Sequence, residues 1–273
     1  MATKEDTAGT ELALAENENA LALSEEFLTG EDTMDDFAQG DFLVPYLRIL
    51  QQLSKELQRG HQKYVKDAQA GEVINSATKQ RWDGDAGFYV IPVSFSHRFQ
   101  AWRPNNGGPA DDYGADDTIY KSLKPDDRGK RLNAEGNEVT DSNQYFVFIV
   151  DPQTGDFEMG VISMSGSQAK KARQWNSVIN NRRERVGGKS VRPPMYFYAY
   201  KVTTVPESNE QGNWYGWSIS AEEGMPVSKI PNARAILEAA KETRERIKAG
   251  EIRTQAEEVE TDGLDDNEDE KAF

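Results

Sequence analysis

Aromatic and basic side chains alternate along several segments of this 273-residue chain. In HRFQAWR, strand alternation places Arg98 and Trp102 on one face and Arg103 on the other. Nucleobases stack on exposed rings with about 1–3 kcal/mol per base and little sequence preference. The alternative for each ring is a place in the core, since one face of every strand must be covered. Alternation also places Tyr196, Tyr198 and Tyr200 on one face of their strand. The candidate stacking rings are Trp102, Tyr196, Tyr198, Tyr200 and Trp214.

One segment, residues 161–204, contains nine Lys or Arg residues and a single acid, Glu184. A track of cations binds phosphates with a salt-sensitive, sequence-independent affinity. A solvated helix face is the alternative, although such faces usually carry charges of both signs. With the bases of the HRFQAWR segment, the candidate phosphate contacts are Arg98, Arg103, Lys170, Lys171, Arg173, Arg182, Arg183, Lys189, Arg192 and Lys201.

Catalytic patterns are weak in this sequence. There is no cysteine, and His61 and His97 are the two histidines, which excludes thiolate and His-rich metal sites. The acids at 111–112 and 116–117 lie in a Gly- and Asp-rich stretch, where solvated turn acids are expected rather than a cation site. Gly187-Gly188-Lys189 lacks the spacing of a phosphate-binding P-loop. We therefore expect no enzyme, no cofactor and no metal.

The net charge of −15 is distributed unevenly. Residues 1–41 hold twelve acids and one base, and residues 257–273 hold nine acids and one base, which leaves about +4 for the residues between them. Both acidic segments lack the apolar residues to build a core, so we expect disordered arms. We expect the polyanionic tail to occupy a cationic groove of its own protein and so inhibit it. We also expect its terminal aromatic residue to dock into a partner protein. The candidate partner-binding residues are Asp265, Asp266, Glu268, Asp269, Glu270 and Phe273.

Between the arms the pattern is mainly that of strands. We expect strands at 71–78, 88–103, 144–151, 156–165, 193–205 and 214–220, with an irregularity at Pro92. A basic helix is expected over 165–186, with Ala169, Ala172, Trp175, Val178 and Ile179 on its apolar face. Apolar spacing predicts a short helix within 42–57, with a strand at 47–50 as the alternative, and residues 104–144 resemble a long loop.

Five or six strands with an embedded helix predict a mainly-β fold with one or two helices. The scale fits a curved β-barrel like the oligonucleotide/oligosaccharide-binding (OB) fold. The expected organisation is an acidic arm (1–41), an OB-like core (42–225), a closing helix (226–256) and an acidic tail (257–273). No apolar run approaches the length of a membrane span, and the N-terminus lacks a signal-peptide pattern, so we expect a cytoplasmic protein without membrane contact.

Three features resemble phage-encoded single-stranded DNA-binding proteins. They are the tail DDNEDEKAF, the β core with interleaved aromatic and basic residues, and the segment from VISMSGSQAKKARQWNSVI to YAYKVTTVPESNEQGNWYGWSI. The bacterial tail of this kind ends in Pro-Phe, whereas this chain has Ala272 before Phe273. The resemblance implies a non-enzymatic protein that binds single-stranded DNA in phage replication, recombination and repair and recruits replication, recombination or transcription proteins through its tail.

Two other functions fit the same residues. A single-strand annealing recombinase would form rings and pair complementary strands. An acidic interaction protein, such as a transcription regulator, would use its arms as the active surfaces and its core would lack salt-dependent DNA affinity. The sequence leaves the oligomeric state open.

Overall fold

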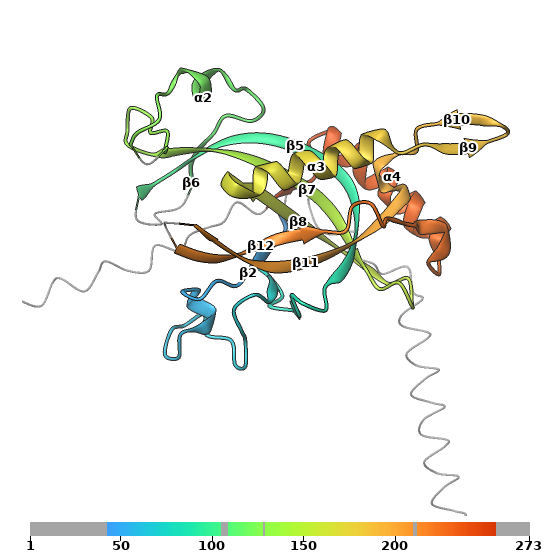
Figure 1. Cartoon of the computed structure of the whole chain (residues 1–273), viewed down its shortest axis with the longest axis horizontal. Helices are drawn as coiled ribbons and strands as arrows, with labels where there is room; N and C mark the ends of the chain where they lie inside the picture. Colours follow the sequence, from blue (N-terminus) through green and yellow to red (C-terminus); the bar gives the residue numbers. More distant parts are fainter. Residues whose placement is uncertain (1–42, 105–108, 128, 210–211, 255–273) are drawn as a thin grey trace, which may run out of the picture. The chain divides into compact units, whose positions relative to one another are not determined.

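A computed structural model describes residues 43–104, 109–127, 129–209 and 212–254 (Figure 1). All of them lie in the second of the chain's two units, Phe42–Phe273. They form a mainly-β unit in which one large sheet curls into a half-barrel, accompanied by few helices. The predicted mainly-β, curved fold is thus confirmed. The two acidic arms lie outside the described residues, as do the six candidate partner-binding residues.

The large sheet has ten strands, more than the five or six expected, because several are short. Its main path runs β12–β11–β5–β7–β8–β2–β3–β4, with β6 beside β5 and β13 beside β11. The pair β2–β8 is parallel, and the other pairs of this sheet are antiparallel. The strands are β2 (Tyr46–Ile49), β3 (Val73–Asn75), β4 (Arg81–Trp82), β5 (Phe88–Trp102), β6 (Pro109–Asp112), β7 (Glu138–Val150), β8 (Phe157–Ser165), β11 (Tyr198–Asn209), β12 (Gly212–Ile219) and β13 (Met225–Pro226).

Two short ladders stand apart from the large sheet. One joins β1 (Leu43–Val44) in parallel to β14 (Arg253–Thr254), and the other is the antiparallel hairpin of β9 (Glu184–Val186) and β10 (Lys189–Val191). The described helices are α2 (Thr118–Ser122), α3 (Ala169–Asn181) and α4 (Ala233–Lys248). Single 3₁₀ turns occur at η1 (Lys55–Leu57), η3 (Gly166–Gln168), η4 (Met195–Phe197) and η5 (Val227–Lys229).

The longest ladder, between β5 and β7, sets the curvature of the sheet. It runs from Tyr89 opposite Val150 to Trp102 opposite Glu138, and its register shifts between Pro92 and Ser94. Proline has no N–H to give to a ladder, and a bulge bends and twists its strand. The irregularity predicted at Pro92 is therefore confirmed.

The inner face of the curled sheet is packed around α3. Alternate residues of β7, such as Tyr145 and Val147, share one core cluster with Val73 of β3 and Trp217 of β12. Strands so distant in the sheet order meet in one cluster only because the sheet curls. Trp175 of α3 fills this interior and lies 4.4 Å from the Tyr145 ring, centroid to centroid.

Four hydrogen bonds, three of them made by side chains, join the two ends of the curled sheet in place of a strand ladder. The Gln51 amide accepts a hydrogen bond from the Tyr215 N–H (2.8 Å) and donates one to the Tyr215 carbonyl (2.9 Å). The Thr204 hydroxyl donates to the Gly71 carbonyl at 2.6 Å, and the Thr204 N–H donates to the Gly84 carbonyl at 2.9 Å. We call these four hydrogen bonds, with Gly71 and Gly84, the seam.

The other face of the sheet is covered by α4, which Figure 1 shows running across it. Ile236 and Ala240 of α4 are fully buried against Ile91 of β5 and Phe148 of β7. The closing helix expected over 226–256 is thus confirmed within shorter bounds. Both faces are buried over residues 90–94 of β5 and 142–150 of β7, which explains the apolar runs in these parts of the two strands.

Two local predictions are wrong. Residues 46–49 form β2 rather than a helix, as the alternative allowed, because Tyr46 and Leu47 are buried on opposite faces in a ladder with β8. Periodicity cannot separate a strand buried on both faces from a helix in so short a run. Residues 104–144 are also not a plain loop, since β6 and α2 lie there and β7 begins at Glu138.

The basic helix ends earlier than predicted. Its apolar face is confirmed for Ala169, Ala172 and Trp175, which are buried, whereas Val178 and Ile179 are half-buried. However, α3 stops at Asn181, and residues 184–191 form the β9–β10 hairpin. Its turn is Gly187-Gly188, with φ of +57° and +80°. A two-residue hairpin turn of this kind requires positive φ at both positions, which glycine adopts without strain.

Candidate nucleic-acid interface

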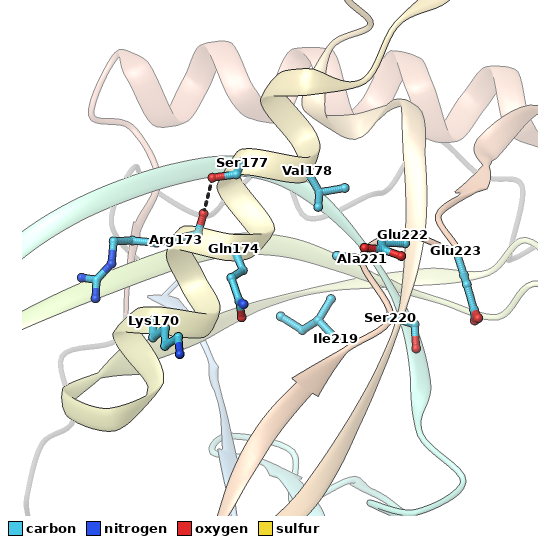
Figure 2. A pocket seen from close by; sticks show the side chains of 10 residues that line it. All are labelled: Lys170, Arg173, Gln174, Ser177, Val178, Ile219, Ser220, Ala221, Glu222 and Glu223. Atoms are coloured by element: carbon cyan, nitrogen blue, oxygen red, sulfur yellow. Dashed lines mark hydrogen bonds between the residues drawn. The ribbon is translucent and has the colours of Figure 1, made fainter.

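The exposed face of α3 carries part of the predicted basic surface. Lys170, Arg173, Gln174 and Ser177 follow helical spacing on the side opposite Trp175. They line one wall of a pocket of about 710 Å³, whose other wall is formed by residues 219–223 (Figure 2). Figure 2 shows Arg173 extending from the helix away from that other wall. Glu222 and Glu223 lie on the other wall, so the cationic part of this pocket is the helix side.

The β9–β10 hairpin carries the rest of the exposed positive charge. Figure 1 shows it extending beyond the C-terminal end of α3, away from the large sheet. The exposed cations of the hairpin and of the residues next to it are Arg183, Arg185, Lys189 and Arg192. Arg183 donates to the backbone carbonyls of Asn180 and Arg182, at 2.8 and 2.7 Å, and these neutral partners leave its charge uncompensated.

The single acid of residues 161–204, Glu184, points toward the protein interior. The Glu184 carboxylate is half-buried and accepts a hydrogen bond from the hydroxyl of buried Tyr198. Together, the face of α3 and the hairpin present six exposed cations, which we call the basic ridge. The basic ridge consists of Lys170, Arg173, Arg183, Arg185, Lys189 and Arg192.

Two predicted phosphate contacts are held inside the fold instead. The Lys171 ammonium forms an ion pair with Glu207 and donates to the Trp217 carbonyl at 2.5 Å. Arg182 donates to the carbonyls of Ala221 (2.8 Å) and Glu222 (3.0 Å). Its guanidinium also lies 4.3 Å from the centre of the Tyr198 ring. Both cations fasten α3 to the β11–β12 side of the sheet, so neither is available to a phosphate without loss of these contacts.

Three predicted stacking rings need correction. Tyr198 and Tyr200 are 6% and 1% exposed, and a buried ring cannot stack on a base. Burial raises the pKa of Tyr200, an effect that the charge and hydrogen bond of Arg182 oppose. Tyr196 does not share their face, because it lies in η4 and packs with the cluster under α4. The strand alternation begins only at Tyr198, after the 3₁₀ turn that follows Pro194.

Three other predicted residues lie apart from the hairpin end of the basic ridge. Arg98, Trp102 and Arg103 are at the end of β5 that pairs with β6, on the opposite side of Figure 1 from the hairpin. Trp102 is half-buried and its ring N–H donates to the Thr140 hydroxyl at 3.0 Å. The structure therefore does not bring all the predicted residues into one continuous track.

Two further candidates lie on the last hairpin of the sheet. Trp214 of β12 is half-buried and donates to Glu207 at 2.8 Å, whereas Lys201 of β11 is half-buried opposite Tyr89. Sequence reasoning missed the β9–β10 hairpin itself, and it counted Arg185 in the basic segment without including it among the phosphate contacts. The sequence pattern that indicates the hairpin is Gly187-Gly188, with Val186 before it and Val191 after it. A Gly-Gly pair between strand-forming residues is typical of a two-residue hairpin turn.

Within the described residues no group of three or more His, Cys, Asp or Glu side chains is arranged to hold a metal ion. No helix among them is long and apolar enough to cross a membrane. Neither curated proteins nor solved structures give a match to the chain. A family model described as Pam3 phage gp34-like protein matches residues 15–253, which is most of the chain. The chain therefore belongs to the Pam3 phage gp34-like protein family.

Proposed function

We propose that this phage protein binds single-stranded DNA without sequence preference and without catalysis, in phage replication, recombination or repair. The observation that supports this most is the basic ridge, in which six exposed cations face solvent while the neighbouring Glu184 points inward. Each phosphate that a cation neutralises releases counterions from the nucleic acid, so the ridge supplies affinity without reading sequence.

Half-buried aromatic rings supply the second part of the proposal. Trp102 and Trp214 each use the ring N–H in a hydrogen bond to the protein, which fixes the ring while its remaining surface stays accessible. Fixed, partly exposed rings are suited to stacking on unpaired bases. Duplex DNA keeps its bases stacked and offers no such partners, so this combination favours single strands.

The experiment is a titration with fluorescent oligo-dT between about 50 and about 200 mM salt, where six phosphate contacts give a log–log slope of roughly −4 for a single strand. The test variant replaces the four hairpin cations by alanine, at Arg183, Arg185, Lys189 and Arg192. We expect affinity at low salt to fall at least about tenfold and the slope to flatten by about 3 units. A matched control removes the same charge at four exposed lysines elsewhere, Lys66, Lys124, Lys229 and Lys241.

Absence of oligo-dT binding at low salt would refute the proposed function. It would favour the interaction protein that acts through its acidic arms. Equal losses in the hairpin variant and the control variant would mean that net charge, rather than the basic ridge, drives binding. Annealing of complementary strands together with ring formation would identify a single-strand annealing recombinase instead.

The acidic tail belongs to the same proposal. We propose that residues 257–273 compete with DNA for the basic ridge and recruit partner proteins when DNA is bound, because nine acids with one base imitate a polyanion. Deletion of 257–273 should then tighten oligo-dT binding at low salt. Unchanged affinity of the truncated protein would rule out autoinhibition by the tail.

A further inference from the structure

A second cavity, distinct from the pocket of Figure 2, opens where β2, β5, β7, β8 and β12 approach one another. It has a volume of about 300 Å³ and is lined mainly by amides, hydroxyls and aromatic rings. A cavity of this size is at the small end for ligand sites, so it fits one small planar group rather than a whole oligomer. Its central lining residues are Tyr46, Gln100, Trp102, Gln144, Ser163 and Tyr215.

The floor of this cavity holds an unpaired polar atom. Gln144 is 1% exposed, and its amide nitrogen donates to the Tyr46 hydroxyl (3.2 Å) and to the Gln100 amide oxygen (3.3 Å). Its own amide oxygen, Oε1, is buried and has no hydrogen-bond partner. A buried acceptor without a donor is destabilising, and native proteins leave few of them. Gln144 therefore holds, just beneath the cavity lining, an acceptor that an N–H group of a ligand would satisfy after a small shift of the surrounding side chains.

The other polar groups of the cavity narrow the class of ligand. The Arg48 guanidinium is paired with the Glu56 carboxylate at 3.1 Å, so the site holds no uncompensated charge to attract a phosphate into it. The amides of Gln51 and Gln168 are used by the backbone of β12, at Tyr215 and Trp217. The amide oxygen of Gln144 is therefore the acceptor left for a ligand. The hydroxyl of Ser163 and the rings of Trp102 and Tyr215 line the cavity with it.

A neutral, planar group with N–H donors matches this lining, and unstacked nucleobases have these properties. The cavity also lies next to the basic ridge along the chain. Gln168 lines the cavity and Lys170, two residues later, begins the ridge. A strand held on the ridge through its phosphates can therefore place one base at the mouth of the cavity.

We propose that this cavity accepts one unstacked nucleobase, whose exocyclic amino group donates a hydrogen bond to Oε1 of Gln144. The inference rests on the proposed function, because the ridge brings the strand to the cavity. Adenine carries an exocyclic amine, whereas thymine offers only its ring N–H and a methyl group. Binding through the cavity thus adds a modest preference for oligo-dA over oligo-dT to an otherwise sequence-independent affinity.

The test compares three oligonucleotides of equal length, namely oligo-dA, oligo-dT and an abasic strand with the same phosphates. Gln144→Met keeps the size of the side chain and removes the acceptor. We expect it to weaken oligo-dA binding by about threefold to tenfold, to reduce the preference over oligo-dT, and to leave the abasic strand unchanged. Gln153→Met, on the exposed β7–β8 turn, is the matched control and should change none of the three affinities.

The outcomes separate this inference from the proposed function. If the wild-type protein binds none of the three strands, the proposed function fails. If it binds them and Gln144→Met alters all three equally or none, the base site is overturned and the cavity holds water only. Ser165→Leu provides an independent variant in case Gln144→Met does not fold. Ser165 is exposed at the cavity mouth on extended backbone, so leucine narrows the entrance and should reproduce the selective loss for oligo-dA.

Discussion

The seam and the β9–β10 hairpin both depend on glycine pairs, for partly different physical reasons. At the seam, a Cβ on Gly84 would lie 2.0 Å from the Gly71 carbonyl oxygen and one on Gly71 would lie 2.8 Å from the Tyr215 ring, so both glycines are required for space, and Gly71 also has a positive φ of +95°. In the hairpin, Gly187 and Gly188 have nothing within 4 Å of a Cβ, and the requirement is positive φ. The seam thus stabilises the half-barrel, whereas the hairpin makes few contacts with it and is free to carry exposed charge.

The largest predicted effect is at the seam. Gly84→Ala forces apart the Gly71 carbonyl and the Thr204 hydroxyl, both within 2.2 Å of the new methyl group. We expect the free energy of unfolding to fall by about 3 kcal/mol, at the upper end for overpacking. Gly188→Ala is the control, because it meets open space and pays only the backbone cost of positive φ, about 1–2 kcal/mol. Urea denaturation of both variants measures the difference, and equal losses would contradict a tight seam.

The second prediction uses adjacent residues on either side of the boundary between the fold and the hairpin. Arg182 is held by two carbonyls and the Tyr198 ring, whereas Arg183 is exposed. Arg182→Met should lower the free energy of unfolding by about 2 kcal/mol, since it removes charged hydrogen bonds and leaves carbonyls unpaired. Arg183→Met should leave the stability nearly unchanged and reduce the salt slope of oligo-dT binding by about 0.7.

Thermal unfolding and the oligo-dT titration, run on both variants, measure the two effects. We expect only Arg182 to stabilise the fold. A loss of stability in Arg183→Met, or an unchanged stability in Arg182→Met, would contradict this expectation. The same pair shows whether Arg182 also contributes to DNA affinity. In that case its salt slope would fall as much as that of Arg183→Met.

Much of the fold followed from local patterns in the sequence. Pro92 predicted the bulge in β5, and the spacing of Ala169, Ala172 and Trp175 predicted the buried face of α3. The end of α3 did not follow, because Val186 fits a helical apolar pattern as well as a hairpin. Gly187-Gly188 was the local evidence for the turn, and it was weighed only as a phosphate-binding motif.

The candidate site was less predictable, because exposure depends on contacts between distant residues. Lys170 and Lys171 are neighbours of the same type, yet only Lys171 meets Glu207, which is 36 positions further along the chain. Arg182 is held by carbonyls 39 and 40 positions away. Strand alternation alone assigned Tyr198 and Tyr200 to one face, as observed, but could not show that α3 covers that face. Long-range pairing therefore separates the cations that fasten the fold from those of the basic ridge.

The smallest predicted effect concerns Glu207, which links α3 to β12. Burial alone would raise the pKa of Glu207, but hydrogen bonds from Lys171, Trp214 and Gln168 and the charge of Lys171 lower it below its ordinary value of 4.5. A carboxyl whose pKa is lower in the folded state stabilises the fold above the unfolded pKa. That contribution is lost as the pH falls through the folded pKa.

Glu207→Gln should therefore lower stability at neutral pH by about 1 kcal/mol and flatten the fall in stability below about pH 4.5. Glu238→Gln is the control, because its ion pair with Arg234 is solvent-exposed and contributes little. Urea midpoints measured from neutral pH down through pH 4 test the difference between the two variants. A Glu207→Gln profile parallel to that of the wild type would show that the carboxylate is not the charged group that holds α3 against β12. In that case the attachment of α3 would rest on Trp175 and the aromatic cluster around it.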